Sequence, residues 1–212
     1  MTRTVSIADG GAGPAREALE DCVRGGGVAV FPADTLYGLG CDPSSGEAIA
    51  RINSLKGRDE AKPSAVMFFA PLAMRELLST LGPRTREALG TLLPGAVTLV
   101  VHNPQSLYPL AGPEHPDRLG IRLIEGSLAG AASPLLQTSA NRSGEQAPSR
   151  FDQVDSRILD GADLAIDGGE LGGEPSTVVD LTALESDGSW RVLREGAVSR
   201  AQIGARLGEP PG

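Results

Sequence analysis

Short apolar runs that stop at a polar, glycine-rich or proline-containing turn recur along this chain, and they constrain its fold more than any other feature. Such runs occupy residues 28–31, 64–69, 96–101 and 118–124. Each is the length of a buried strand, and stretches with the apolar spacing of a helix lie between several of them. A loose alternation of strands and helices favours an α/β domain built on a mixed sheet.

The remaining segments fit this class and suggest no repeat or linker. Pro14 stands at a first helical turn, and three glycines that begin at Gly25 end the segment that follows it. The 212 residues suffice for one domain, 1–212, with a short frayed tail at about 208–212. Further helices are expected at 46–55, 72–81, 84–92, 152–159 and 201–207, further strands at 134–137, 162–166, 176–181 and 189–194, and a surface loop at 102–117.

Charge and composition exclude several kinds of protein. The chain has 19 Lys and Arg against 27 Asp and Glu, a net charge of −8, which argues against binding nucleic acid through a large basic face. Two cysteines without a C-x-x-C pair, and only two histidines, argue against a zinc site or a disulfide framework. No segment has the length and apolarity of a membrane span or of a secretory leader, so a cytoplasmic protein with reduced thiols is expected.

One segment gathers three cations behind a polar turn. The sequence FPADTLYGLGCDPSSGEAIARINSLKGRDEAKP ends with Lys56, Arg58 and Lys62. Arginine offers a planar fork and lysine a point charge, so together they could neutralise a polyphosphate. The same three residues alone are more typical of a solvated helix end.

Other polar turns also follow predicted strands. They are FPADTLYGLG, TSANRSG, DGGELGGEPST and LREG. Because ligands of open α/β sheets usually bind beyond the strand ends, these turns are candidate pieces of one pocket. Ser139, Asn141, Ser176 and Thr177 supply hydroxyl and amide groups for phosphate oxygens, a ribose or an amino acid. Each turn alone is more typical of a helix cap or a loop.

Better-known signatures are missing. The chain has neither the G-x-x-x-x-G-K-[ST] pattern of a P-loop nor the G-x-S-x-G elbow of a hydrolase. Cys41 could in principle act as a nucleophile with His102 or His115, but a cysteine beside a glycine turn is more typical of a small packed residue.

Taken together, the segments resemble the YrdC family, the threonylcarbamoyl-AMP synthases. The matching pieces are FPADTLYGLG, SLKGRDEAKP, LLPGAVTLVV, GIRL, TSANRSG, IDGGELGGEPSTVVDL and VLREG, which follow one another in the family's order from Phe31 to Gly196. The resemblance implies a twisted open α/β sheet with a positively charged concave pocket. The chain resembles the short form of the family, without the additional C-terminal domain of the longer members.

The resemblance also implies a reaction. L-threonine and bicarbonate would form a carbamate, which attacks the α-phosphate of ATP, with Mg²⁺ as the cofactor that accompanies ATP. The product, L-threonylcarbamoyl-AMP, would pass to a partner transferase that modifies tRNA, whereas direct tRNA binding by this chain stays an open question. The residues show no general base, so the chemistry would rely on positioning and charge.

Site residues follow by resemblance, position by position. Lys56 and Arg58 would be catalytic. Thr35, Arg122 and Ser176 would bind L-threonine, with the fork of Arg122 on its carboxylate. The ATP-binding residues would be Lys56, Arg58, Lys62, Ser139, Asn141 and Arg194.

Four positions depart from the family's pattern. Ala33 and Ala147 stand where polar residues are usual, Ala96 replaces a proline, and Ile124 stands where a proline is usual after GIRL. These departures leave two alternatives open besides the synthase. One is a paralogue that uses another amine or has lost the synthesis, and the other is an RNA-binding accessory protein, which the net charge and the scarcity of aromatic residues disfavour.

Overall fold

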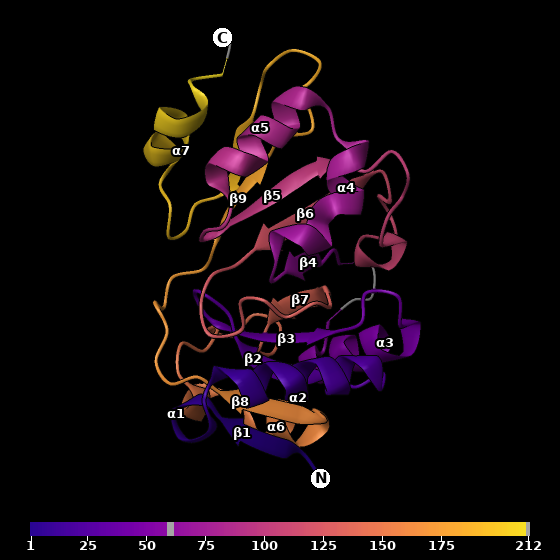
Figure 1. Cartoon of the computed structure of the whole chain (residues 1–212), viewed down its shortest axis with the longest axis vertical. Helices are drawn as coiled ribbons and strands as arrows, with labels where there is room; N and C mark the ends of the chain where they lie inside the picture. The colour runs from indigo at the N-terminus through magenta and orange to yellow at the C-terminus, as the bar shows by residue number, and fades with distance from the viewer. Residues whose placement is uncertain (59–61, 211–212) are drawn as a thin grey trace.

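The protein is built around one large sheet, as the computed structural model of residues 1–58 and 62–210 shows (Figure 1). Within these residues ten strands join in the order β1-β8-β2-β3-β7-β4-β6-β5-β9-β10, with parallel and antiparallel neighbours. The prediction of an α/β fold with a mixed sheet is therefore confirmed. The strands are β1 (Arg3–Ser6), β2 (Ala29–Pro32), β3 (Tyr37–Cys41), β4 (Ala65–Phe68), β5 (Val97–His102), β6 (Arg118–Leu123), β7 (Leu135–Ser139), β8 (Leu164–Asp167), β9 (Thr177–Asp180) and β10 (Arg191–Arg194).

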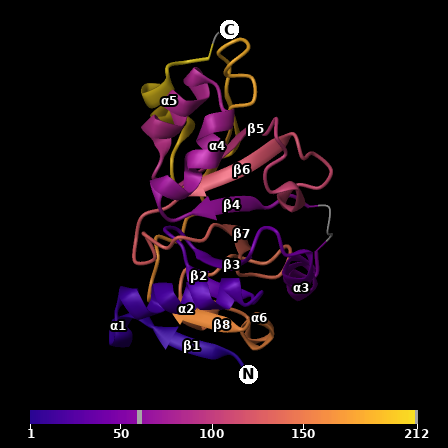
Figure 2. The ribbon, with the colours of Figure 1, turned by 45° about the vertical axis from the view of Figure 1, so that its right-hand side comes forward.

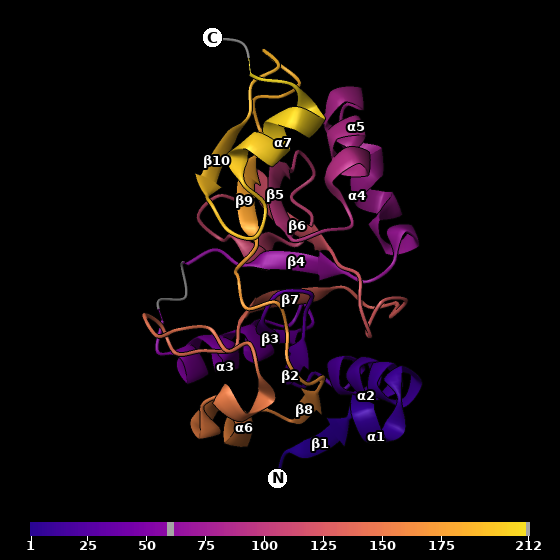
Figure 3. The same cartoon turned by 90° about the vertical axis from the view of Figure 1, so that its left-hand side faces the viewer.

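The helices cover the sheet unevenly. They are α1 (Ile7–Gly10), α2 (Ala12–Arg24), α3 (Gly46–Lys56), α4 (Arg75–Thr80), α5 (Pro83–Leu92), α6 (Ser156–Gly161) and α7 (Arg200–Leu207), with 3₁₀ turns η1 (Pro71–Met74), η2 (Pro109–Ala111) and η3 (Phe151–Gln153). Figure 3 shows α3 and α6 on one side of the strands near the N-terminus, with α1 and α2 on the other side. The two termini lie at opposite ends of the sheet (Figure 1).

Strand alternation divides the core into two apolar clusters. On and beside β2, Val28 and Val30 belong to the larger cluster, whereas Ala29 and Phe31 belong to the smaller one. The larger cluster includes residues of α3 to α7, and the smaller one receives its buried helical side chains from α2, with Ile7 of α1 packed against it. On the face of the sheet that holds the smaller cluster, α2 therefore covers only the part beside β2 and β8. The strands farther along the sheet are not covered by α2 on this face, and they carry other kinds of residue there.

Two strands were not predicted from the sequence. The prediction of a polar, glycine-rich turn for FPADTLYGLG was wrong over Tyr37–Cys41, which pairs with both β2 and β7. Glycine is a weak strand former, but the ring of Phe31 occupies the space beside Gly38 and Gly40, where a Cβ atom would lie 2.7 and 3.0 Å from it. The edge strand β1 has the short and mostly polar sequence RTVS, which gives no strand signal.

The end of α3 aims the chain at the centre of the sheet. Ser45 caps the helix by accepting a bond from the Ala48 N–H, and Gly57 ends it in the left-handed conformation with φ of 59°. The next residue, Arg58, turns back toward the sheet. Near the C-terminus, Trp190 donates to the carbonyl of Gly208, so the tail predicted to fray makes contacts there. Its last two residues, 211–212, lie outside the described residues.

Candidate active site

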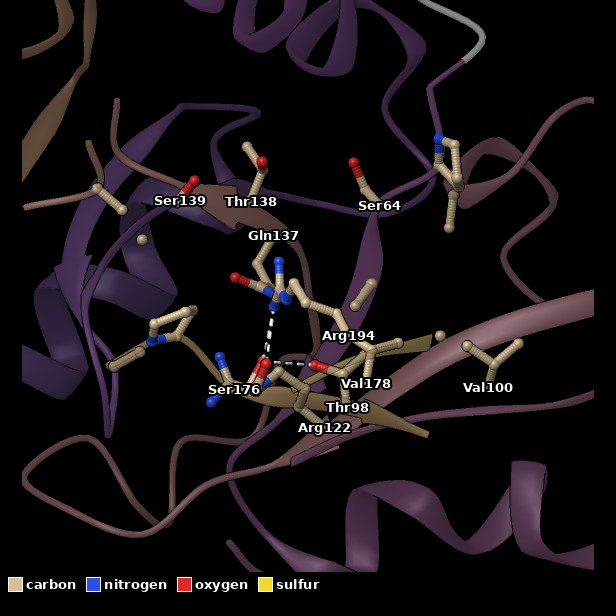
Figure 4. A pocket seen from close by; sticks show the side chains of 18 of the residues that line it. Ser64, Thr98, Val100, Arg122, Gln137, Thr138, Ser139, Ser176, Val178 and Arg194 are labelled. Carbon is tan, nitrogen blue, oxygen red and sulfur yellow. Dashed lines mark hydrogen bonds between the residues drawn. The ribbon is translucent and has the colours of Figure 1, made fainter. Parts of the chain in front are cut away.

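A cavity of about 550 Å³ opens on the same face of the sheet as the smaller cluster, in the part of that face that α2 leaves uncovered. Figure 4 shows part of its lining, which comes from strands that are distant in sequence. Strand residues at alternate positions share this face, and here most of them are small or polar instead of large and apolar. Those that line the cavity are Gly38, Ala65, Thr98, Val100, Gly120, Arg122, Gln137, Ser139 and Val178.

Small side chains across neighbouring strands make room for the cavity. Ala65 on β4 lies opposite Gln137 on β7 and Gly120 on β6, and Gly120 lies opposite Val100 on β5. The loop between β5 and β6 runs beside the start of β4 (Figure 2). It contributes Ala111 and Gly112 to the lining, and the Ala111 carbonyl accepts a bond from the Ser64 N–H at 2.7 Å. The resulting volume lies within the range of about 300–1,000 Å³ that is usual for small-molecule sites.

Arg122 forms a buried ion pair in the wall of the cavity. Its side chain is only 5% exposed, and its Nη2 donates to Oδ1 of Asp34. Burial lowers the pKa of Arg122, and the charge of Asp34 opposes this change. Arginine keeps its charge in proteins, and at this guanidinium there is little water to screen its attraction for an anion.

Ser176 is held by two neighbours beside this arginine. Its Oγ lies 2.9 Å from Oγ1 of Thr98, and Nη2 of Arg194 donates to its carbonyl at 2.8 Å (Figure 4). Arg194 itself is exposed, and its charge contributes to lowering the pKa of Arg122. Two positive charges therefore meet at this end of the cavity.

Lys56 fixes the turn that follows β7. Its ammonium group donates to the carbonyls of Ser139 and Asn141, and the residue is only 4% exposed. Burial, together with the charges of Arg58 and Lys62, lowers the pKa of Lys56 to about 8. The two carbonyl oxygens favour the ammonium form and so oppose this change. Lys56 thereby shapes the part of the cavity that Ser139 and Asn141 line.

Arg58 connects three segments behind the cavity wall. Its Nε donates to Oδ1 of Asn53 at 2.7 Å, its Nη1 to Oγ1 of Thr138 at 3.2 Å, and its Nη2 to Oγ of Ser64 at 2.6 Å. Burial lowers the pKa of Arg58. Because Thr138 and Ser64 line the cavity, Arg58 sets their hydroxyl groups in place.

The structure brings most of the predicted site residues together. Six of them line the cavity: Thr35, Arg122, Ser139, Asn141, Ser176 and Arg194. Lys56 and Arg58 lie directly behind its lining and hold lining residues, and Lys62 is exposed but close enough to affect the pKa of Lys56. The predicted direct contacts of these three cations with phosphate stay a prediction.

Sequence reasoning missed several polar residues of the cavity. Thr98 and Gln137 lie within predicted apolar strands, and Ser64 begins another. The signal that could have found them is a single polar residue in an otherwise apolar run, because it marks a face of the strand that is not packed with apolar side chains. Asp34 gave no such signal, because only the fold brings its loop to β6.

The four departures from the family's pattern fall in different places. Ala33 and Ala147 line the cavity and make its wall less polar. Ala96 is not among the lining residues, and its carbonyl accepts a strand-type bond from the Thr177 N–H. Ile124 is 3% exposed and packs within the smaller apolar cluster.

Residues 1–58 and 62–210 contain no group of three or more His, Cys, Asp or Glu side chains that could hold a metal ion. None of the helices in this part of the chain has the length and apolarity needed to cross a membrane.

The fold and its cavity define an α/β protein with an arginine-containing cavity on the open face of a mixed sheet. The family model Sua5_yciO_yrdC, described as "Telomere recombination", matches residues 21–196. The chain therefore belongs to the Sua5/YciO/YrdC family.

Individual relatives agree with this assignment. The threonylcarbamoyl-AMP synthase of Chromohalobacter salexigens is 33% identical over 171 residues, which cover 77% of this chain and 91% of that protein. The crystal structure of P. abyssi Sua5 complexed with L-threonine has a TM-score of 0.81 and 26% identity, and it covers 99% of this chain but 62% of that one. The crystal structure of E. coli YciO has a TM-score of 0.79 and 24% identity, with 96% and 100% of the two chains covered, and it shows the same fold.

Proposed function

We propose that this protein is an L-threonylcarbamoyladenylate synthase, a nucleotidyltransferase that converts L-threonine, bicarbonate and ATP to threonylcarbamoyl-AMP and pyrophosphate. The observation that carries the proposal is the 33% identity to a threonylcarbamoyl-AMP synthase over most of both chains. The P. abyssi relative that was crystallised with L-threonine supports the amino-acid substrate. The cavity has arginines at one end and hydroxyl and amide groups at the other, which supports the binding of an amino acid and a nucleotide next to each other.

The reaction needs charge stabilisation more than covalent help from the protein. The amine of threonine takes up the carbon of bicarbonate to give a carbamate and water. A carbamate oxygen then forms a bond to the α-phosphorus of ATP, and the bond from that phosphorus to the pyrophosphate oxygen breaks. Negative charge grows on the phosphoryl and leaving oxygens, so fixed cations and hydrogen-bond donors lower the barrier.

The amino acid would bind at the arginine end of the cavity. Arg122 would take the carboxylate, because its guanidinium is buried and lines the cavity. Thr35 and Ser176 would complete this subsite, with the hydroxyl of Ser176 fixed by Thr98. Arg194, which holds the backbone of Ser176, would lie between the amino acid and the nucleotide.

The nucleotide would bind along the turn after β7. Ser139 and Asn141 line this part of the cavity and would contact ATP directly. Lys56 and Arg58 would act at close range from behind them, as the catalytic charges that hold this wall, and Lys62 would extend the positive charge at the surface. Their combined charge favours a polyphosphate even though the whole chain is acidic.

Mg²⁺ would enter with ATP. When bound to the phosphates, the ion supplies positive charge that offsets the charge on the leaving pyrophosphate. The few carboxylates of the cavity fit this use, because Mg²⁺ in nucleotide sites takes most of its ligands from phosphate and water and needs few from the protein. Glu114 and Glu145 line the cavity and are the carboxylates that could add a protein ligand.

The product would need a consumer. Threonylcarbamoyl-AMP is a mixed anhydride that hydrolyses in water, so a partner transferase that uses it for tRNA modification is the expected next step. Cytoplasmic localisation is part of the same proposal.

Release of pyrophosphate tests the proposed function. The assay contains ATP, Mg²⁺ and bicarbonate, with L-threonine, with L-serine or without an amino acid. We expect release that requires both threonine and bicarbonate. Pyrophosphate release that does not depend on threonine would refute the proposal. If the protein binds ATP but releases no pyrophosphate, the cavity takes an amine other than threonine.

Two arginines of β10 provide a matched pair for this assay. Arg194 lines the cavity, whereas Arg191, on the same strand, pairs with Asp180 outside it. We expect Arg194→Gln to lower kcat/KM at least about tenfold, the effect of losing a charged hydrogen bond. Arg191→Gln should change it less than about twofold, because Arg191 does not line the cavity. Equal losses in both variants would contradict the placement of the site.

A further inference from the structure

We propose that Asp34 is a positioning residue, which holds the guanidinium of Arg122 in the orientation that receives the carboxylate of the amino-acid substrate. This inference rests on the proposed function, which places that carboxylate at Arg122. Asp34 is not itself among the residues that line the cavity, although both of its neighbours, Ala33 and Thr35, are. It would therefore act through Arg122 and not by touching the substrate.

The ion pair spans the sheet. Asp34 belongs to the loop that follows β2, and Arg122 lies on β6, with β3, β7 and β4 between these strands. The loop is anchored independently of the pair, because the Ala33 N–H donates to the Leu36 carbonyl at 3.2 Å and the Gly173 N–H donates to the Thr35 carbonyl at 3.0 Å. A carboxylate on an anchored loop can fix the direction of a long, flexible arginine.

The pair uses only one prong of each partner. Among the described residues, Arg122 is hydrogen-bonded through Nη2 alone, and Asp34 accepts through Oδ1 alone. Arginine and carboxylate often form two parallel bonds, so a single bond leaves the rest of the guanidinium unused. Since Arg122 lines the cavity, a second carboxylate can accept a hydrogen bond from another N–H group of its guanidinium without displacing Asp34.

Asp34 also offsets repulsion at this end of the cavity. The charge of Arg194 disfavours the charged form of Arg122, and burial acts in the same direction. The side chain of Asp34 is 14% exposed, so its charge acts on Arg122 with little screening by water. Without Asp34, a buried guanidinium would lack its counter-charge and would have no fixed direction.

Replacement of the carboxylate tests this role in the full-length chain. In the pyrophosphate assay we expect Asp34→Asn to raise KM for L-threonine at least about tenfold, as for a lost charged hydrogen bond, and to leave KM for ATP within about twofold. Asp34→Glu should recover part of the threonine affinity. A purely structural role predicts instead that both KM values rise together, and an unchanged KM for threonine would equally overturn the inference.

A matched buried aspartate controls for loss of stability. The side chain of Asp180 on β9 is 6% exposed and pairs with Arg191, and neither residue lines the cavity. Asp180→Asn should lower the melting temperature and leave KM for threonine unchanged. A similar rise of that KM in Asp180→Asn would show that the Asp34 effect is not specific.

A measurement on the unliganded protein separates this inference from the proposed function. Side-chain ¹⁵N NMR should show restricted rotation of the Arg122 guanidinium in the wild type and free rotation in Asp34→Asn. This result is expected even if the wild type releases no pyrophosphate, in which case the function and not the ion pair is wrong. Equal rotation in the two proteins would overturn the positioning role.

Discussion

Lys56 combines deep burial with a position next to two other cations. Its ammonium donates to two backbone carbonyls, while burial, Arg58 and Lys62 lower its pKa to about 8. An ordinary lysine has a pKa near 10.5 and keeps its charge throughout the neutral range. The charge of Lys56 therefore titrates close to neutral pH, at a residue that shapes the proposed nucleotide end of the cavity.

The lowered pKa of Lys56 predicts how stability depends on pH. Between about pH 8 and pH 10.5 the unfolded chain binds this proton more tightly than the folded protein does, so the free energy of unfolding should rise with pH. Relative to Lys56→Met, the wild type should gain about 2–3 kcal/mol across this window. Urea unfolding of both proteins at several pH values measures the gain. A difference that stays constant with pH would contradict the lowered pKa.

Sequence patterns picked out many of the residues that line the cavity or hold its wall, but not the direction of their side chains. Lys56 and Arg58 were expected to face phosphate, and the structure places protein acceptors around both. The reason is physical, since a motif fixes a neighbourhood while side-chain direction depends on acceptors that come from other segments. Asp34 escaped prediction for the same reason, because its partner lies on a strand far away in the sequence.

At the scale of elements, glycines on the strands determine where a neighbouring side chain packs against the sheet and where space is left open. Gly38 and Gly40 of β3 lie beneath the ring of Phe31, whereas Gly120 of β6 borders the cavity beside Ala65. A Cβ atom at Gly38 would lie 2.7 Å from Phe31, and one at Gly120 would lie 3.5 Å from the nearest atom, an ordinary contact. Both glycines line the cavity, but Gly38 also makes room for the ring of Phe31, whereas Gly120 leaves open space for a ligand.

This contrast predicts opposite results from two substitutions. Gly38→Ala should destabilise the protein by about 1–3 kcal/mol, the usual cost of overpacking. Gly120→Leu should fill the cavity, change stability by less than about 1 kcal/mol and abolish measurable ATP binding. Urea unfolding and calorimetric titration with ATP measure the two effects. Undiminished ATP affinity in Gly120→Leu would show that the nucleotide binds elsewhere.

The sequence predicted individual elements better than their arrangement. The apolar runs at 96–101 and 118–124 correspond to β5 and β6 within a residue at each end. Their periodicity is local and thus visible in the sequence. The strand order is not local, because β1 joins β8 and β5 joins β9 through pairings between distant segments.

At the scale of the whole molecule, one connection completes the site. The chain from β8 to β9 crosses from the second to the ninth position of the sheet (Figures 1 and 3). The Tyr37 hydroxyl accepts a bond from the Gly168 N–H at 3.0 Å and donates to the Gly169 carbonyl at 2.8 Å. The crossing ends at Ser176, beside Thr98 and Arg194. A chain with a net charge of −8 thereby places several arginines around one concave surface.

The most direct test of the account follows the carbon of bicarbonate. The protein is incubated with ATP, Mg²⁺, L-threonine and ¹³C-labelled bicarbonate, and the products are analysed by mass spectrometry. The account predicts an AMP derivative that contains threonine and a single ¹³C atom, in an amount equal to the pyrophosphate released before hydrolysis sets in. Pyrophosphate release without a labelled adenylate, or a labelled adenylate with no threonine in it, would contradict the account.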